Sequence, residues 1–336
     1  MSKGSRGLIV LACLAIGVWA WTGAVAAASA DAITVERVGA LEEALSLDID
    51  SEWIYFLDYL SADTVLAYDG GGGEVWDLAT GSLVRRFPAS EAGRLLALFP
   101  DGDRAVSLLG DRIVIWTFAA PDDRVDVCTL EDSNTSRAAV SPDGRWLALV
   151  RRGTEVELWD VESMTRIHVL QGHTSNLFRL AFSPDGRWLA SASGLSGGGP
   201  DDSCIKVWDV ATGELLATLA TPELGDNHDI EFSADGRLLV TIGVFGFQVW
   251  STETWTRVHE TTSSNYGGYG VAIGVESDLA VFATDNRFVL LWDLATSEAL
   301  GHIFLPHEIT AVAFSEDGAE LTFFVRDGTL RVWRLP

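Results

Sequence analysis

The chain has 336 residues, of which 48% are hydrophobic and 10% aromatic, and its formal net charge at pH 7 is −25. This apolar and aromatic content excludes an intrinsically disordered chain, and three cysteines are too few for a disulfide scaffold. Because so acidic a surface repels phosphate backbones and anionic lipid headgroups, we expect no nucleic-acid partner.

Residues 1–30 have the features of a secretory signal peptide. Lys3 and Arg6 form a basic start, residues 7–28 are uncharged and mostly apolar, and Ala28-Ser29-Ala30 fits an A-x-A cleavage site. The apolar run is longer than most signal sequences need, so residues 7–28 would act as an N-terminal membrane anchor if they stay uncleaved. In both cases we expect the protein outside the cytoplasm, either secreted or periplasmic.

Two markers recur through the rest of the chain. Tryptophan ends a short β-like run seven times, at intervals of 40, 43, 49, 42, 42 and 41 residues. These residues are Trp76, Trp116, Trp159, Trp208, Trp250, Trp292 and Trp333. A tight turn keeps the same spacing: FPDG at 99–102, SPDG at 141–144 and 183–186, SADG at 233–236 and SEDG at 315–318, with degenerate forms at 61–64 and 275–278.

Each repeat carries signals for four strands. Asp-Gly supplies the turn conformation that closes a hairpin between the first two strands. The run after the turn, such as RWLALV, favours a strand, and the run that ends in tryptophan forms the third. A second turn, as in DVATGEL at 209–215, leads to a fourth. Four strands in about 43 residues are typical of one propeller blade.

The dipeptide Trp-Asp stands at 76–77, 159–160, 208–209 and 292–293. The fullest repeat runs from Gly172 to Ser193 and finishes with IKVWDVATGELL. On these motifs the chain resembles the WD-repeat β-propeller family over about residues 33–336. The resemblance implies a single seven-bladed propeller over residues 31–336. The turn–strand–tryptophan pattern is also similar to that of TolB-type periplasmic propellers.

The way the ring closes fixes the number of blades. The chain ends three residues after Trp333, so the last repeat lacks its own fourth strand. Ile33–Leu41 (ITVERVGAL) has the missing pattern, and we predict that it completes the last blade and removes the free sheet edges. The expected fold is all-β: a seven-bladed β-propeller of four-stranded antiparallel blades, closed by the N-terminal strand.

One group of residues could be mistaken for a Ser-His-Asp triad. It comprises His173, Ser191 or Ser193, Asp202 and Trp208. In the WD-repeat family the matching residues form a buried structural tetrad joined by hydrogen bonds. No nucleophile elbow or second base accompanies them. We therefore expect a structural role and no enzyme activity.

The sequence shows no metal-ligand pattern and no phosphate-binding loop. His168, His259 and His302 recur on the fourth strands of different repeats, so they point away from one another. A metal needs several ligands converging on one point. We expect neither a metal nor a cofactor.

A ligand of a propeller would sit at the mouth of the central channel. Positions about five residues before each hairpin turn should line this mouth, and the resemblance implies that they contact partner peptides. The candidate binding residues are Phe56, Phe178, His228 and Tyr269, with Arg137, Arg179 and Asp229 beside them and Tyr266 in the glycine-rich loop 263–270. Arginines within an acidic protein would favour an acidic peptide or a carboxylate.

The favoured function is a non-enzymatic scaffold that binds a protein or peptide outside the cytoplasm. Two alternatives stay open: a propeller hydrolase or lactonase with a channel site, and a TolB-like component of an envelope complex.

Overall fold

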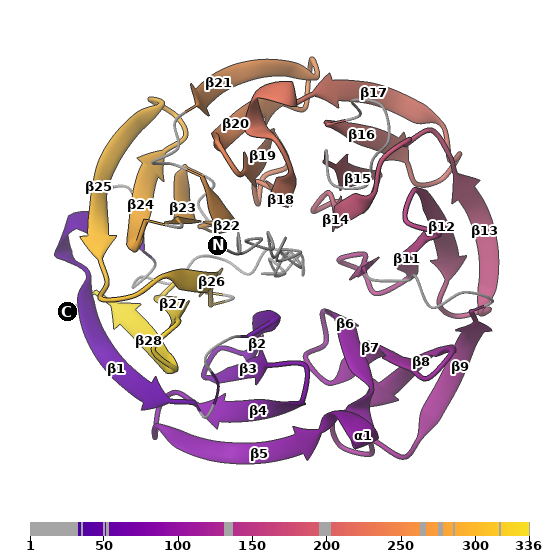
Figure 1. The fold of residues 1–336 in the computed structure, drawn as a ribbon, viewed down its shortest axis with the longest axis horizontal. Coiled ribbons are helices and arrows are strands. Elements are labelled where there is room, and N and C mark those ends of the chain that lie inside the picture. Colours follow the sequence, from indigo (N-terminus) through magenta and orange to yellow (C-terminus); the bar gives the residue numbers. More distant parts are fainter. Residues whose placement is uncertain are drawn as a thin grey trace, which may run out of the picture.

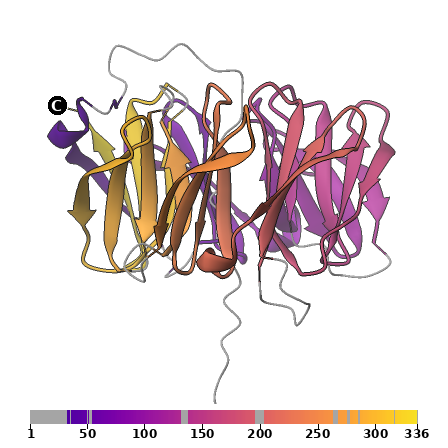
Figure 2. The same ribbon diagram turned by 90° about the horizontal axis from the view of Figure 1, so that it is seen from above.

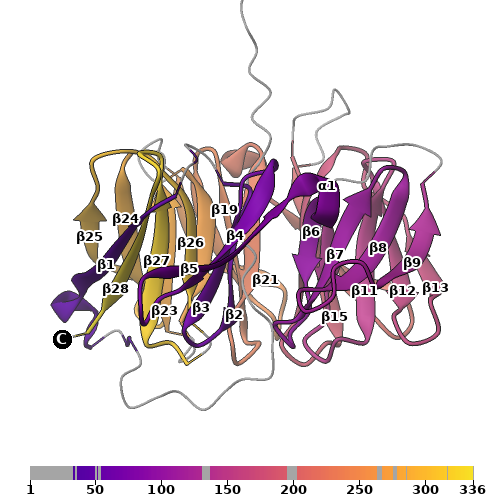
Figure 3. The same cartoon turned by 90° about the horizontal axis from the view of Figure 1, so that it is seen from below.

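The computed structural model describes residues 33–34, 36–49, 51, 54–130, 137–194, 203–262, 267–274, 278–284, 286–315 and 317–335. In this part of the chain, seven four-stranded antiparallel sheets stand around a ring (Figure 1). The side views show a short, wide cylinder whose strands run between its two faces (Figure 2 and Figure 3). The predicted all-β, seven-bladed propeller is confirmed.

The seven blades are numbered along the chain. Blades 1 and 2 are β2 (Phe56–Ser61), β3 (Thr64–Tyr68), β4 (Gly72–Asp77), β5 (Ser82–Pro88), and β6 (Arg94–Leu98), β7 (Arg104–Leu109), β8 (Arg112–Thr117), β9 (Arg124–Thr129). Blades 3 and 4 are β10 (Ala138–Val140), β11 (Trp146–Arg151), β12 (Glu155–Asp160), β13 (Thr165–Leu170), and β14 (Leu177–Phe182), β15 (Trp188–Ser193), β16 (Cys204–Asp209), β17 (Leu215–Ala220). Blades 5 and 6 are β18 (Asn227–Phe232), β19 (Leu238–Gly243), β20 (Gly246–Ser251), β21 (Thr256–Thr262), and β22 (Gly268–Ile273), β23 (Leu279–Thr284), β24 (Phe288–Asp293), β25 (Glu298–Phe304). Blade 7 combines β26 (Ile309–Phe314), β27 (Glu320–Val325) and β28 (Thr329–Arg334) with β1 (Glu42–Asp48). The short helices are η1 (Val38–Ala40), α1 (Ala89–Ala92) and η2 (Pro222–Leu224).

The place of a strand within its blade explains its composition. First strands lie innermost, where those of neighbouring blades contact one another, and fourth strands form the rim (Figure 1). β23 (LAVFAT) and β27 (ELTFFV) lie between two neighbouring blades and are buried along their whole length. Strands covered on both faces are mostly apolar, whereas the rim strand β17 is exposed at four of its six positions.

The hydrophobic core is divided among the interfaces between blades. One buried cluster lies at each of the seven interfaces. Between blades 5 and 6, for example, the rings of Phe247 and Phe282 stack with their centroids 4.1 Å apart. Sheet-to-sheet packing of this kind makes each blade depend on both neighbours for burial.

The N-terminal strand closes the ring, as predicted. β1 pairs antiparallel with β28, from Glu42 opposite Arg334 to Asp48 opposite Thr329 (Figure 3). Leu47 is buried and Leu45 packs beside it in the cluster between blades 7 and 1. The closing strand therefore contributes apolar side chains as well as backbone hydrogen bonds.

The predicted segment for this strand, Ile33–Leu41, is wrong. Glu42–Asp48 takes its place, because Leu45 and Leu47 alternate inward in register with β28. Within 33–41, Val38 begins the short helix η1 and is buried with Ile33 between blades 6 and 7. The Ile33 N–H donates to the Gly318 carbonyl at 2.8 Å. This segment thus covers the end of an interface beside the closing strand.

Cys128 in blade 2 and Cys204 in blade 4 do not form a disulfide. Among the described residues, no helix has the length and apolar character needed to cross a membrane. Residues 1–30, the predicted signal peptide or anchor, lie outside the described part of the chain.

Candidate functional site

One face of the ring is here called the mouth face. It is formed by the loops that lead into the first strand of each blade and by the loops that join the second strand to the third. α1 marks it at the top of Figure 3. Four first strands carry an irregularity in pairing at the end nearest this face: β14, β18, β22 and β26. The extra residues are Phe178, His228, Tyr269 and Thr310. A bulge leaves its extra residue outside the ladder and re-aims the side chain.

His228 and Tyr269, from neighbouring blades, form a stacked pair. Their ring centroids lie 5.7 Å apart with an angle of 9° between the planes. The His228 Nδ1–H donates to the Gly268 carbonyl at 2.9 Å. Burial lowers the pKa of His228, so the imidazole is neutral at pH 7. Both side chains keep part of their surface exposed, which leaves a polar and aromatic ledge on the mouth face.

Phe178 continues this ledge in blade 4, where its side chain is half-buried. Its carbonyl accepts hydrogen bonds from Arg137 Nε at 2.7 Å and from Arg179 Nη1 at 2.8 Å. Phe56 behaves differently, since it is 2% exposed and packs between blades 1 and 2. The irregularity of β2 lies at Leu60, near the other end of the strand. Phe56 therefore does not present its ring on the mouth face. Tyr266 lies outside the described residues.

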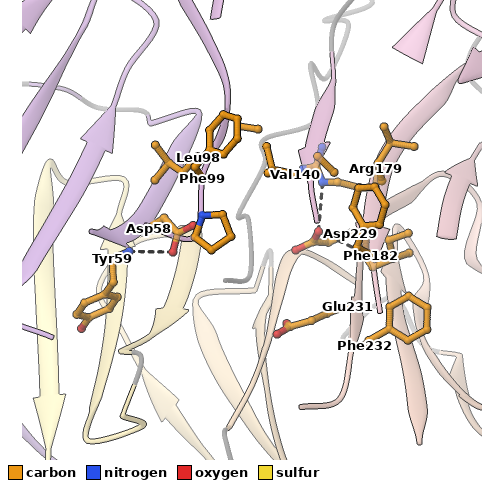
Figure 4. A pocket seen from close by; sticks show the side chains of 16 residues that line it. Asp58, Tyr59, Leu98, Phe99, Val140, Arg179, Phe182, Asp229, Glu231 and Phe232 are labelled. Atoms are coloured by element: carbon orange, nitrogen blue, oxygen red, sulfur yellow. Dashed lines mark hydrogen bonds and ion pairs between the residues drawn. The ribbon is translucent and has the colours of Figure 1, made fainter. Parts of the chain in front are cut away.

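Arg179 and Asp229 bind each other across blades 4 and 5. Arg179 is 1% exposed and Asp229 3%, and Arg179 Nε donates to Asp229 Oδ1 at 3.2 Å (Figure 4). Asp229 also accepts the N–H groups of Ile230 at 3.1 Å and of Val271, in blade 6, at 3.2 Å. The expectation that Arg179 would meet an acidic ligand is therefore wrong: its charge is used inside the protein.

The charges around this pair are unusual. Burial raises the pKa of Asp229 to about 7, although Arg179 opposes the shift. Burial also lowers the pKa of Arg137 to about 9, and the charges of Arg179 and Arg94 add to this effect. Arg94 in blade 2 and Arg179 in blade 4 thus both lie within electrostatic reach of Arg137, which directly precedes β10 of blade 3.

A cavity of about 50 Å³ lies within the channel below the mouth face. Its titratable lining consists of Asp58, Tyr59, Arg179, Asp229 and Glu231, and the other lining residues are mostly apolar (Figure 4). Burial raises the pKa of Asp58 and of Glu231 well above their usual values. No group of three His, Cys, Asp or Glu side chains among the described residues is arranged to hold a metal ion.

Sequence reasoning missed Asp58 and Glu231. The signal was present in the sequence of the strand itself: each is an acid within an innermost strand, in FLDYLS and NHDIEF, and is followed directly by an aromatic residue. Carboxylates are seldom fully buried without a partner, so acids at these positions mark the channel.

The expected tetrad residues of blade 4 lie at the interface with blade 3. Ser191 Oγ is 2.8 Å from His173 Nε2 and accepts a hydrogen bond from Trp208 Nε1 at 2.8 Å. Ser193 Oγ donates to the carbonyl of Cys204 at 3.1 Å, and Asp202 lies outside the described residues. Both serines are fully buried, so their hydroxyls face neighbouring strands and offer no surface to a substrate.

The indole N–H of the equivalent tryptophan in the other blades has a different hydrogen-bond partner, or none among the described residues. In blade 2, Trp116 Nε1 donates to Ser107 Oγ at 2.8 Å. In blades 1 and 3 the acceptor is the glutamate two residues earlier, so Trp76 bonds Glu74 at 3.0 Å, and Trp159 has an equivalent bond. In blades 5, 6 and 7 the indole N–H groups have no hydrogen-bond partner among the described residues.

Comparison with known proteins agrees with this architecture. Residues 164–209 and 299–334 match the family model "WD domain, G-beta repeat". The chain is 29% identical over 241 residues to the uncharacterized WD repeat-containing protein sll1491 of Synechocystis, a match that covers 71% of this chain and 67% of that protein.

Other similar proteins are much longer than the matched region. The chain is 26% identical over 137 residues to the F-box/WD repeat-containing protein sel-10 of Caenorhabditis elegans, which covers 40% of this chain and 22% of sel-10. It is 31% identical over 106 residues to Tricorn protease homolog 1 of Streptomyces coelicolor, which covers 31% of this chain and 10% of that protein. The chain thus spans about a fifth of sel-10 and a tenth of Tricorn protease homolog 1.

Proposed function

Since the chain is a WD-repeat β-propeller, an architecture that typically serves as a protein-interaction scaffold, we propose that it binds a protein or peptide partner outside the cytoplasm without catalysing a reaction. The mouth face is the proposed contact surface. The extracytoplasmic location rests on the sequence of residues 1–30.

The observation that carries this proposal is the stacked pair of His228 and Tyr269. Two adjacent blades use the same bulge to place these rings at the channel mouth, with Phe178 on the next blade. Partly exposed rings that are already ordered lose little conformational entropy on binding, which is why aromatic residues dominate binding hot spots.

A non-enzymatic role fits the polar groups that the structure describes. The one Ser–His contact of blade 4, between Ser191 and His173, is buried and shared with an indole. In the channel, Asp58 accepts a backbone N–H, and Asp229 is held by Arg179 and by backbone N–H groups. None of these arrangements leaves an accessible nucleophile beside a base.

Affinity capture from an envelope extract tests the proposal. The wild-type chain and the double variant His228→Ala, Tyr269→Ala serve as baits, and Phe304→Ala is the matched control. Phe304 is 71% exposed on the rim strand β25. We expect the double variant to lose a specific partner that the wild type and Phe304→Ala both retain. Equal recovery by all three baits, with equal thermal stability, would remove the mouth face as the contact surface.

The location is tested separately by N-terminal sequencing of the protein purified from its native host. A chain that starts at Asp31 indicates cleavage after Ala30, whereas an intact residue 1 with membrane recovery indicates an anchor. Recovery of an intact chain from the cytosol would contradict the proposed location.

A further inference from the structure

The channel cavity is lined by more acidic side chains than basic ones. Of its titratable lining groups, Arg179 and Asp229 form an ion pair with each other. Asp58 and Glu231 form no ion pair within the described part of the chain. Figure 4 shows them on opposite sides of the cavity, Asp58 on β2 and Glu231 on β18.

Glu231 has a carboxyl oxygen whose hydrogen-bonding capacity is unused among the described residues. Its side chain is 7% exposed, and the backbone N–H of Ile273 only partly offsets the rise that burial causes in its pKa. That oxygen, Oε2, is buried and has no hydrogen-bond partner among the described residues. A buried carboxyl oxygen without a hydrogen-bond partner is costly, and the ionised form is costlier still because its charge is desolvated, which is why burial raises the pKa. A donor that enters the cavity would remove this cost.

The nearby charges favour a cationic donor. Besides burial, the charges of Asp229 and Asp58 raise the pKa of Glu231, so these carboxylates interact across the cavity. A positive group between them would stabilise their ionised forms. The whole chain, with a net charge of −25, also concentrates cations near its surface.

The size of the cavity and the number of acceptor groups in its lining favour an ammonium group over a metal ion. About 50 Å³ has room for roughly three water molecules. Calcium and magnesium need about six oxygen ligands, and the described side chains offer no metal-binding group of three. An ammonium group has three N–H donors and needs only two or three acceptors.

We propose that the channel cavity beside Glu231 binds a primary ammonium group, with Glu231 Oε2 as its principal acceptor and the Asp58 carboxylate as the opposing negative charge. The group belongs to a free small amine or to a lysine side chain of a partner. The cavity lies below the mouth face, and this inference stands whether or not that face binds a protein.

Thermal unfolding of the full chain measures the binding. The probe is n-butylammonium chloride, and tetramethylammonium chloride at the same ionic strength is its control, because it has the charge but no N–H donor. A ligand that binds the folded state raises Tm with concentration. We expect Tm to rise with n-butylammonium and to stay unchanged with tetramethylammonium. Equal shifts with both salts would overturn the proposal, and so would no shift with either.

Two variants test the acceptors. Glu231→Gln keeps the shape and removes the charge, and Glu298→Gln changes an exposed acid on the rim strand β25. We expect Glu231→Gln to weaken n-butylammonium binding at least about tenfold, as expected for loss of a hydrogen bond to a charged group, while Glu298→Gln matches the wild type. Asp58→Asn gives a smaller loss and covers the case in which Glu231→Gln folds poorly. Unchanged binding in both channel variants would overturn the assignment, as would micromolar Ca²⁺ binding that n-butylammonium does not displace.

A third set of probes separates the two sources of the amine and keeps this inference distinct from the proposed function. A short lysine peptide is compared with its Nε-acetyl-lysine form on the wild type and on Tyr269→Ala. If the free-amine peptide stabilises the wild type and loses this effect in Tyr269→Ala, while n-butylammonium still stabilises both, the amine comes from a partner at the mouth face. If n-butylammonium acts and the peptide does not, the ligand is a free amine.

Discussion

Replacing Arg179 with methionine tests how the inner ring of strands is held together. The substitution keeps a long apolar side chain and removes the cation that neutralises Asp229, along with the hydrogen bond to the Phe178 carbonyl. Because both partners are almost fully buried, the variant leaves the Asp229 carboxylate buried without its cation. Breaking one partner of a buried pair costs about 3–5 kcal/mol. At about 2 °C per kcal/mol for a chain of this size, Tm falls by about 6–10 °C.

The effect should depend on pH in a defined direction. Burial raises the pKa of Asp229 to about 7 in the folded wild type, against 3.8 as its usual value. The folded state therefore holds this proton more tightly, and the contribution of Asp229 to stability falls as pH rises from about 4 to about 7. Loss of Arg179 raises the pKa of Asp229 further, so the stability deficit of Arg179→Met relative to the wild type is small at pH 5 and grows as the pH rises past about 7.

Scanning calorimetry at pH 5 and pH 8 checks this reasoning, with two further variants. Arg237→Met removes an exposed arginine that pairs with Asp235 and should cost less than about 1 kcal/mol. The double variant Arg179→Met, Asp229→Asn removes both charges and should recover part of the lost stability. A deficit below about 1 kcal/mol at pH 8, or one that is equal at pH 5 and pH 8, would refute the buried-pair argument.

Three other substitutions have effects that follow from the structure. Tyr59→Phe removes a hydroxyl that lies 2.5 Å from Thr322 Oγ1 between blades 1 and 7. It should lower the free energy of unfolding, measured in urea, by about 1–2 kcal/mol. An unchanged free energy of unfolding would show that this contact does not stabilise the interface between blades 1 and 7. Ser191→Ala removes the hydrogen-bond partner that the His173 imidazole and the Trp208 indole share, so it should lower the free energy of unfolding by about 2–3 kcal/mol. Ser107→Ala removes the partner of one indole only and should cost about 1 kcal/mol. Equal losses of stability in the two variants would contradict this reasoning. Leu47→Asp places a charge in the closing strand's buried position and should cost more than about 3 kcal/mol, measured as a lower Tm and faster proteolysis; wild-type stability would mean that β1 is dispensable.

The repeating markers made the architecture predictable, but not the identity of the closing strand. Seven regularly spaced tryptophans predict seven blades, and the structure completes the seventh blade with an N-terminal strand. The choice between Ile33–Leu41 and Glu42–Asp48 depends on register with β28 and on the burial of Leu47. These contacts join residues about 280 positions apart, so local pattern does not contain them.

The candidate site was predictable only where the chain repeats its geometry. The count back from the hairpin turn finds Phe178, His228 and Tyr269, because their strands share one bulge. It misplaces Phe56, whose strand has its irregularity elsewhere. The pairing of Arg179 with an acid 50 residues later depends on which side chains meet across a blade boundary, and residue spacing alone does not reveal it.

The closing strand also has a consequence for synthesis. Asp48 leaves the ribosome early, whereas Thr329, its partner in the ladder, is translated 329 − 48 = 281 residues later. Until then a nascent chain exposes β1 unpaired and an open sheet edge at its growing end, both able to capture strands from other molecules. Pairing so distant in sequence is slow to form, so the last step of folding is the one at which this protein most needs protection from its neighbours.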